Sequence, residues 1–401
     1  MTFWLKNIKI EKNYIYSDDW ISGTKTENVA ILIDDGKFKK IIPMKEWEDS
    51  VGDTVIDGQG NLLLPGIIEK HCHLDKNKLG APWHPVSPAN SIIERFEAEI
   101  PELNALDISI ENRAQNLINL EQSHGVVAFR SHIDIEPATG LRHFNAIKNK
   151  VNHDGIKAEL VAFPQHGLLR SNSVALIEQA LTNGATYIGG VDPYTLDGDY
   201  KKSLATTFNL AKKYHTGIDI HLHDRNEAGR KTFLEIIRLT KENNLQGHVY
   251  ISHAFGLNDF TLKERKQLFA EMAELKIQIV SSIPIDPDTI PPLDELQSAG
   301  VQIHIGCDNI DDAWSSLGDG SIPEKLVRYL EMYHISTQDG LSQSLGLITD
   351  GITPLDKTGK QVWPQINDDA SFILTTASCS AEFVARKSPV KQSYSSGKKI
   401  K

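Results

Sequence analysis

The sequence predicts a (β/α)8 barrel flanked by a small β domain, and three observations carry this prediction. Eight short β-rich segments follow residue 65, separated by stretches with apolar residues at three- and four-residue spacing. Crossovers of about 20 to 50 residues suit parallel strands joined by helices. Potential ligands and acid–base groups stand at the C-terminal ends of six segments, where such barrels carry their chemistry. A doubly wound sheet is the alternative, but no glycine fingerprint for a nucleotide follows an early strand.

The barrel is expected over residues 65–346. Its eight candidate strands span residues 65–73, 125–134, 158–166, 185–193, 217–224, 248–254, 277–284 and 301–308. Residues 203–215, 227–244 and 262–276 show the clearest helical periodicity between these strands. A further helix-rich stretch is expected at about 322–346.

The two ends of the chain are expected to form the small β domain together. Residues 28–42 hold two apolar runs around Asp34-Asp35-Gly36, which is a strong hairpin signal. Residues 1–64 are therefore assigned to the first part of this domain. Residues 347–401 return to short β segments and are assigned to the second part, with a partly disordered tail as the alternative.

Composition excludes several classes of protein. With 401 residues, 40% hydrophobic and 24% charged, the chain has the make-up of a soluble globular protein. A net charge of -11 argues against binding to nucleic acid or to an anionic membrane. No apolar run approaches the roughly 18 residues that span a bilayer, and the first residues lack a signal-peptide layout. Three sparse cysteines fit a reducing compartment, so a cytoplasmic location is expected.

The strand ends suggest a metal centre. On a strand His71 and His73 point the same way, and Cys72 points to the opposite side. His221 and Asp308 end two other predicted strands, and imidazole with carboxylate suits zinc or ferrous iron. We therefore predict His71, His73, His221 and Asp308 as ligands. The alternative is a set of hydrogen-bonded core histidines in the barrel mouth.

The sequence favours one divalent metal ion. No lysine ends the second, third or fourth strand to bridge two ions, and Asp192 is the only carboxylate candidate there. Zn²⁺ is favoured, with Fe²⁺ as the alternative. Cys72 and Cys307 are expected to pack against the helices. His253 is either a further ligand or the base beside the metal, and His132 has no stronger interpretation than surface or packing.

Five motifs together resemble one enzyme family. These are LPGIIEKHCHLDK, FPQ, DIHLHD, ISHA and GCDN, and they look like the cytosine deaminase branch of the amidohydrolase superfamily over essentially the whole chain. The resemblance implies a metal-dependent hydrolase that attacks a carbon–nitrogen bond, usually in a ring. It also implies a homo-oligomer with a small N-heterocyclic substrate.

Within this branch one residue departs from the cytosine deaminases. They carry H-x-x-E after strand five, whereas here His221 is followed by His223 and Asp224. The chain is more similar to the N-isopropylammelide isopropylaminohydrolases, which have H-x-H at this strand. The resemblance also implies the pocket residues Lys76, Gln165, Asp192, Asn309 and Trp314.

These residues suggest a reaction, the hydrolytic removal of ammonia or a small alkylamine from a cytosine- or s-triazine-like ring. His253 and Asp308 would accept the proton of a metal-activated water, and His223 would protonate the departing nitrogen. Lys76 would stabilise negative charge, and Asp224 would orient a histidine or cap the strand end. Two alternatives are a ring-opening lactam hydrolase and an inactive metal-binding barrel that serves as a binding protein.

Overall fold

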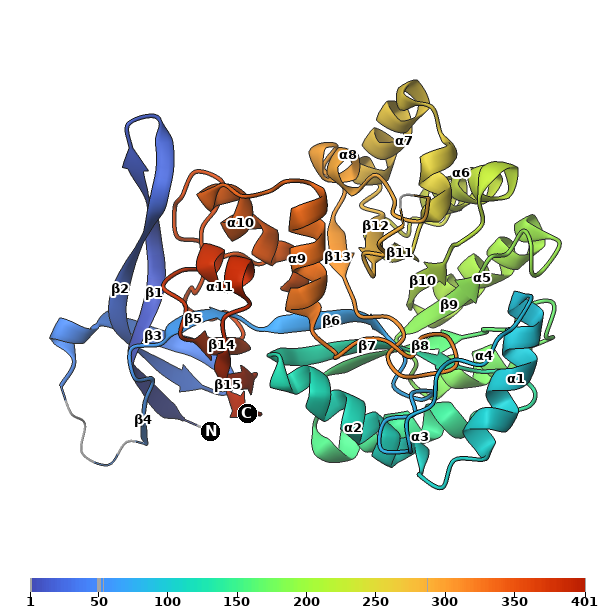
Figure 1. The fold of residues 1–401 in the computed structure, drawn as a ribbon, viewed down its shortest axis with the longest axis horizontal. Helices are drawn as coiled ribbons and strands as arrows, with labels where there is room; N and C mark the ends of the chain where they lie inside the picture. The colour runs from blue at the N-terminus through green and yellow to red at the C-terminus, as the bar shows by residue number, and fades with distance from the viewer. Residues whose placement is uncertain (1, 49–51, 53, 287, 401) are drawn as a thin grey trace. The chain divides into compact units, whose positions relative to one another are not determined.

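The computed structural model describes residues 2–48, 52, 54–286 and 288–400 (Figure 1). The chain divides into two compact units. The barrel unit comprises Lys70–Asn119 and Phe129–Gly320, and the end unit comprises Met1–Glu69, Leu120–Ala128 and Ser321–Lys401.

An eight-stranded sheet forms the barrel, with strand order β13-β12-β11-β10-β9-β8-β7-β6. The strands are β6 (Ile67–Cys72), β7 (Val126–Asp134), β8 (Ala158–Phe163), β9 (Tyr187–Val191), β10 (Gly217–His221), β11 (Val249–Ser252), β12 (Gln278–Ser281) and β13 (Ile303–Ile305). Asp308 N donates to His71 O at 2.7 Å, which joins the last strand region to the first. The predicted fold class is confirmed, and each strand lies within its predicted segment.

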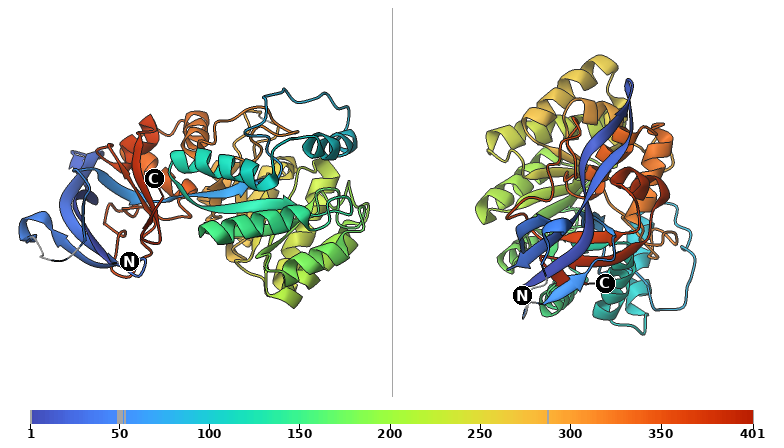
Figure 2. Two further views of the ribbon diagram at one scale, coloured as in Figure 1. Left: turned by 90° about the horizontal axis from the view of Figure 1, so that it is seen from below. Right: turned by 90° about the vertical axis from the view of Figure 1, so that its left-hand side faces the viewer.

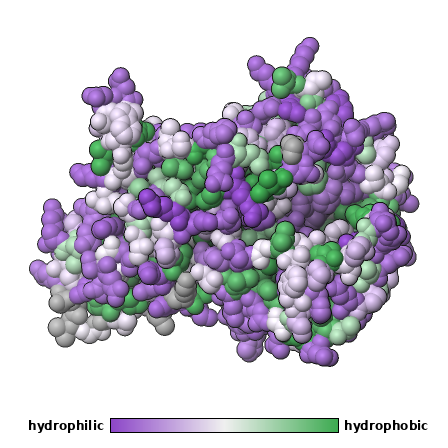
Figure 3. Space-filling view, viewed as in Figure 1, coloured by the Kyte–Doolittle hydropathy of each residue, from purple (hydrophilic) through white to green (hydrophobic). Residues whose placement is uncertain are grey.

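Helices alternate with these strands. They are α1 (Ile92–Asn104), α2 (Ile110–Ser123), α3 (Arg142–Asp154), α4 (Val174–Thr182), α5 (Tyr200–Tyr214), α6 (Asn226–Glu242), α7 (Leu262–Glu274) and α8 (Leu293–Ser298). In α7, Thr261 and Glu264 form a capping box that fixes its start. Hydrophilic residues prevail on the outer helical surfaces visible in Figure 3. Among the described residues, no helix combines the length and apolar character that crossing a bilayer requires.

A buried arginine fills the barrel interior below the strand ends. The guanidinium carbon of Arg130 lies 3.9 Å from the ring centroids of both Tyr187 and Tyr250. Its Nη1 donates to Asp219 Oδ2 at 3.0 Å, and its Nε donates to Glu159 at 2.8 Å. Paired charges and aromatic faces compensate the burial of this guanidinium. Arg130 and these partners lie beneath the strand-end side chains.

The end unit combines strands from both ends of the chain, as predicted, and the two sets lie side by side in Figure 2. Its sheet order is β16-β15-β14-β5-β1-β2-β3, with β4 paired to β1. The strands are β1 (Phe3–Ser17), β2 (Trp20–Asp34), β3 (Lys37–Pro43), β4 (Val55–Asp57), β5 (Leu62–Pro65), β14 (Phe372–Thr375), β15 (Val390–Ser395) and β16 (Lys398–Lys399). The predicted hairpin at Asp34-Asp35-Gly36 joins β2 and β3. The helices α9 (Ile322–Met332), α10 (Gln338–Ser344) and α11 (Ser380–Arg386) belong to the same unit.

Candidate active site and metal centre

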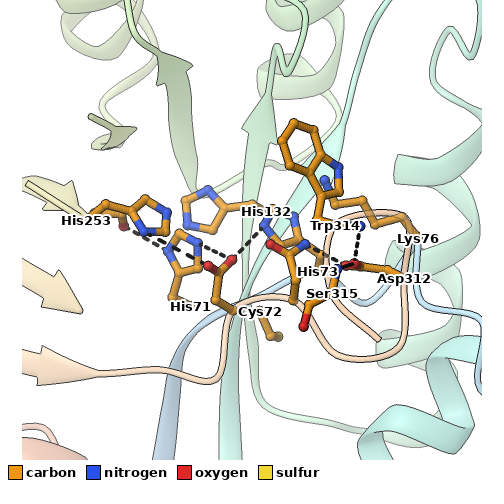
Figure 4. A network of polar contacts seen from close by, with 12 residues as sticks. His71, Cys72, His73, Lys76, His132, His253, Asp312, Trp314 and Ser315 are labelled. Carbon is orange, nitrogen blue, oxygen red and sulfur yellow. Dashed lines mark hydrogen bonds and ion pairs between the residues drawn. The ribbon is translucent and has the colours of Figure 1, made fainter. Parts of the chain in front are cut away.

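The predicted metal ligands lie together at the C-terminal ends of the barrel strands. One ring nitrogen from each of His71, His73 and His221 lies within 4.8 Å of the other two. Asp308 Oδ1 lies 3.4 Å from His71 Nε2 and 3.5 Å from His73 Nε2. In Figure 4 the histidines gather on one side of the site, with Lys76, Asp312 and Trp314 on the other.

A buried chain of hydrogen bonds orients His71. Its Nδ1 lies 2.8 Å from Ser252 Oγ, and Ser252 Oγ donates to Asp219 Oδ1 at 2.7 Å. Because the serine proton is directed to the carboxylate, Ser252 accepts from Nδ1–H of His71. The lone pair of this imidazole is then on Nε2, the atom that faces Asp308. Histidine ligands are commonly oriented in this way by a partner on the other ring nitrogen.

The electrostatics keep the imidazoles neutral. Burial, with the nearby Lys76, lowers the pKa of His73 to about 4. Burial and the neighbouring histidines hold the pKa of His221 well below its usual value. Burial opposes ionisation of Asp308, yet the adjacent imidazoles keep the pKa of this carboxyl well below its usual range. Neutral imidazoles and an ionised carboxylate are the protonation states that bind a metal.

The donor set fits a divalent cation. Both ring nitrogens of His221 are buried without a hydrogen-bond partner among the described residues, and so is His73 Nδ1. Buried polar atoms rarely lack partners, so such a cluster fits a bound group. Three imidazoles and one carboxylate suit Zn²⁺ or Fe²⁺. Cys72 does not belong to this cluster, because its Sγ donates to Arg130 O at 3.5 Å.

His253 lies at the edge of the cluster. Its Nδ1 is 4.0 Å from Asp308 Oδ2, and its Nε2 is buried without a hydrogen bond to a described residue. Burial lowers the pKa of His253 well below its usual value, so the ring is neutral and keeps a lone pair on one nitrogen. Both residues have left-handed backbones, with φ of 70° at His253 and 63° at Asp308. Such conformations in residues other than glycine are strained and concentrate at functional sites.

His132 is a member of the cluster that the sequence did not single out. It is completely buried, and its ring centroid lies 4.3 Å from that of His71 and 4.5 Å from that of His221. Burial and the adjacent histidines lower its pKa well below the usual value. Strand parity could have found it, because Arg130, His132 and Asp134 alternate with outward residues along β7. It packs beneath the predicted ligands.

A cavity with about 370 Å³ of empty space, which includes space open to solvent, adjoins the cluster. Nine predicted residues line it, namely His73, Lys76, Gln165, His221, His223, His253, Asp308, Asn309 and Trp314. The sequence missed Ile92 and Phe96, which α1 contributes one turn apart. Their spacing of four places them on one helix face, but nothing in the sequence indicated that this face closes a pocket.

Asp192 was predicted among the pocket residues, and Asp224 was predicted to orient a histidine or cap the strand end; neither lines the cavity. Asp192 Oδ2 lies 2.8 Å from His223 Nδ1, and its Oδ1 accepts from the backbone nitrogens of His223 and Asp224 at 2.6 and 2.9 Å. Asp224 accepts from Thr195 Oγ1 at 2.6 Å. Burial alone would lower the pKa of His223, but Asp192 raises it above the usual value. Asp192 therefore positions His223 from behind.

Lys76 forms the other end of the cavity. Its Nζ donates to Gln165 Oε1 and lies 3.7 Å from Asp134 Oδ1 and 3.9 Å from Glu99 Oε1. Burial opposes its charge, but Asp134 and Glu99 raise the pKa of Lys76 above its usual value. The lysine is therefore an ammonium group that donates hydrogen bonds into a polar cluster.

The comparisons with known proteins identify the family. A family model described as amidohydrolase family matches residues 107–342. The chain belongs to the amidohydrolase family. This amidohydrolase is 37% identical to the uncharacterized protein YahJ of Escherichia coli K12, over 99% of this chain and 87% of the relative. It is 28% identical to N-isopropylammelide isopropyl amidohydrolase of Pseudomonas sp. strain ADP, over 76% of each chain.

Solved structures support the same assignment. N-isopropylammelide isopropylaminohydrolase of Burkholderia multivorans superposes with a TM-score of 0.85 at 27% identity, covering 100% of this chain and 98% of its own. The 5-methylcytosine deaminase of Klebsiella pneumoniae, at 22% identity, shares the fold with a TM-score of 0.79, covering 100% of this chain and 97% of its own. The predicted resemblance and the enzyme class, a hydrolase of carbon–nitrogen bonds, are confirmed for this amidohydrolase.

Proposed function

We propose that the chain is a metal-dependent aminohydrolase that removes ammonia or a small alkylamine from an N-heterocycle bearing ring carbonyls. One observation carries this proposal: a cluster of side chains that could hold a metal ion, a histidine held by an aspartate and a buried ammonium group surround one cavity. The similarity to N-isopropylammelide aminohydrolases at 27 and 28% identity supports the same reaction class.

The proposed metal ligands are His71, His73, His221 and Asp308. When bound, one divalent ion would supply a water whose pKa is lowered toward neutrality. Zn²⁺ remains the favoured ion, with Fe²⁺ as the alternative. A cytoplasmic location and assembly into a homo-oligomer remain predictions from the sequence.

The chain itself would move the protons. His253, neutral and with a buried Nε2, is placed to accept a proton from the attacking water together with Asp308. His223 Nδ1 is held by Asp192, which leaves Nε2 for the departing nitrogen. His223 lies beside His253, with ring centroids 4.3 Å apart, so the proposed acceptor and donor would act at the same part of the cavity.

The opposite end of the cavity would hold the ring. Lys76 is placed to stabilise negative charge that develops on a ring carbonyl. Trp314 lines this end of the cavity, and Lys76 Nζ lies 5.6 Å from the centroid of the Trp314 ring. Water exclusion by Ile92 and Phe96 would strengthen these interactions.

A substrate panel tests the proposal. The metal-loaded enzyme is incubated with cytosine, isoguanine, ammelide, N-alkylated ammelides and hydantoins, and released amines and ring opening are measured. We expect amine release from N-alkylated rings and little from cytosine. Fast cytosine turnover would contradict the role of His223, and ring opening without amine release would identify a lactam hydrolase.

A further inference from the structure

Two buried carboxylates lie just outside the cavity, and the proposed reaction uses neither. Glu99 of α1 and Asp312 after β13 are each 1% exposed, and neither lines the cavity. Each one instead bonds an amide side chain that does line it.

Glu99 fixes the direction of Gln165. Its Oε2 accepts from Gln165 Nε2, and its Oε1 accepts from Trp314 Nε1 at 3.0 Å. A carboxylate only accepts, so the NH₂ of Gln165 must face Glu99. The amide oxygen then faces Lys76 Nζ, which only donates. Both ends of this amide are therefore set by charged partners, and flipping it would break both contacts.

Asp312 fixes Asn309 in the same way. Its Oδ2 accepts from Asn309 Nδ2 at 2.5 Å. Its Oδ1 accepts from the backbone nitrogens of Trp314 and Ser315 at 2.8 and 2.9 Å. Because the turn holds Asp312 in place, the NH₂ of Asn309 is drawn to it. The amide oxygen Oδ1 is left for a ligand in the cavity.

We propose that Glu99 and Asp312 are positioning residues that set substrate specificity by fixing these two amides. The Lys76 and Gln165 end then offers N–H donors, and Asn309 offers an acceptor. The matching ligand edge is a cis-amide, a ring carbonyl next to a ring N–H, rather than a ring nitrogen acceptor. This inference rests on the proposed function, since it names the ring edge that the same cavity selects.

The test measures binding, so it does not depend on turnover. Uracil presents cis-amide edges, and 2,4-dimethoxypyrimidine has the same ring with nitrogen acceptors and no N–H. Calorimetric titration at about pH 8.5 keeps Asp312 ionised, because burial raises the pKa of Asp312 to about 7 against the influence of Lys76. The wild-type chain should prefer uracil. If it shows no such preference, the proposal is wrong, whatever the substrate panel reveals.

Asp312→Asn is the decisive variant. The new amide can still accept from the turn, but its NH₂ faces Asn309 and favours the flipped orientation. The uracil preference should fall by on the order of tenfold, with a gain for the dimethoxy ring. Asp197→Asn is the matched control, because Asp197 accepts from the backbone nitrogens of Leu169 and Arg170 at 2.9 and 3.1 Å in another loop. An equal loss for both rings in Asp312→Asn, or the same change in the control, would overturn the proposal.

Glu99→Gln provides a second variant if Asp312→Asn fails to fold. The introduced amide has one acceptor oxygen where the carboxylate had two, so it cannot accept from both Gln165 Nε2 and Trp314 Nε1. Gln165 then loses its single orientation. Uracil affinity should fall on the order of tenfold, and the Trp314 indole N–H resonance should shift in a ¹⁵N spectrum. An unchanged preference together with a shifted resonance would restrict Glu99 to a structural role and contradict its part in specificity.

Discussion

Removing the hydroxyl of Ser252 should weaken metal binding without touching any proposed ligand. Ser252→Ala deletes the acceptor of His71 Nδ1–H and breaks the link to Asp219. Ser252 is 0% exposed and His71 is 2% exposed, so water cannot easily replace the hydroxyl. Loss of such a supporting partner typically lowers metal affinity by about 10- to 100-fold, or about 1.4 to 2.7 kcal/mol. The hydrogen-bond chain from His71 through Ser252 to Asp219 is buried throughout, so we expect an effect in the upper half of that range.

The assay is competition for Zn²⁺ against a chromophoric chelator, which reports affinity without any substrate. Ser281→Ala is the matched control, because Ser281 is 1% exposed at the end of neighbouring β12 and its Oγ accepts from Ile283 N at 3.1 Å, away from His71. Ser252→Thr keeps a hydroxyl and should retain most of the affinity. Unchanged affinity in Ser252→Ala, or an equal fall in Ser281→Ala, would refute the reasoning.

Four further variants test other parts of the molecule. Asp308→Asn should lose bound metal and activity together while Cys72→Ala keeps both, and metal analysis beside amine release checks this contrast. Burial raises the pKa of Glu11 from 4.5 to about 7, so the stability that its bound proton contributes is lost as the pH rises through that range. Glu11→Gln should therefore raise the free energy of unfolding at pH 8 by about 3 kcal/mol at most, with no gain below about pH 4.5. Urea titrations at the two pH values check this, and an equal gain at both would contradict it. Arg130→Met should destabilise the fold by about 3–5 kcal/mol in urea titrations, because Asp219 is left as an uncompensated buried charge, and a loss under 1 kcal/mol would contradict it.

The sequence predicted the barrel because its signals are local. Apolar strand segments recur eight times with helical periodicity between them, clearest in three stretches, and parity places His71 and His73 on one side of a strand. The strand order then brings His221 and Asp308 to the same end of the barrel. This part of the candidate site needed no knowledge of side-chain packing.

The rest depends on contacts that the sequence does not encode locally. Glu99 lies in α1, within the long connection after β6, and only packing brings it to Gln165. Asp192 looked like a pocket residue at a strand end, but its backbone, with a φ of 35°, turns the carboxylate behind His223. Asp312 carries no signal in the sequence that indicates its contact with the amide of Asn309.

Titration of the metal-free chain with Zn²⁺, with amine release from an N-alkylated ammelide as the readout, tests the central claim most directly. The ligand set His71, His73, His221 and Asp308 predicts that the rate is negligible without metal, rises linearly and saturates at one equivalent per chain. Amine release by the metal-free chain, or a requirement for a second equivalent, would contradict the single-metal aminohydrolase proposed for this cavity.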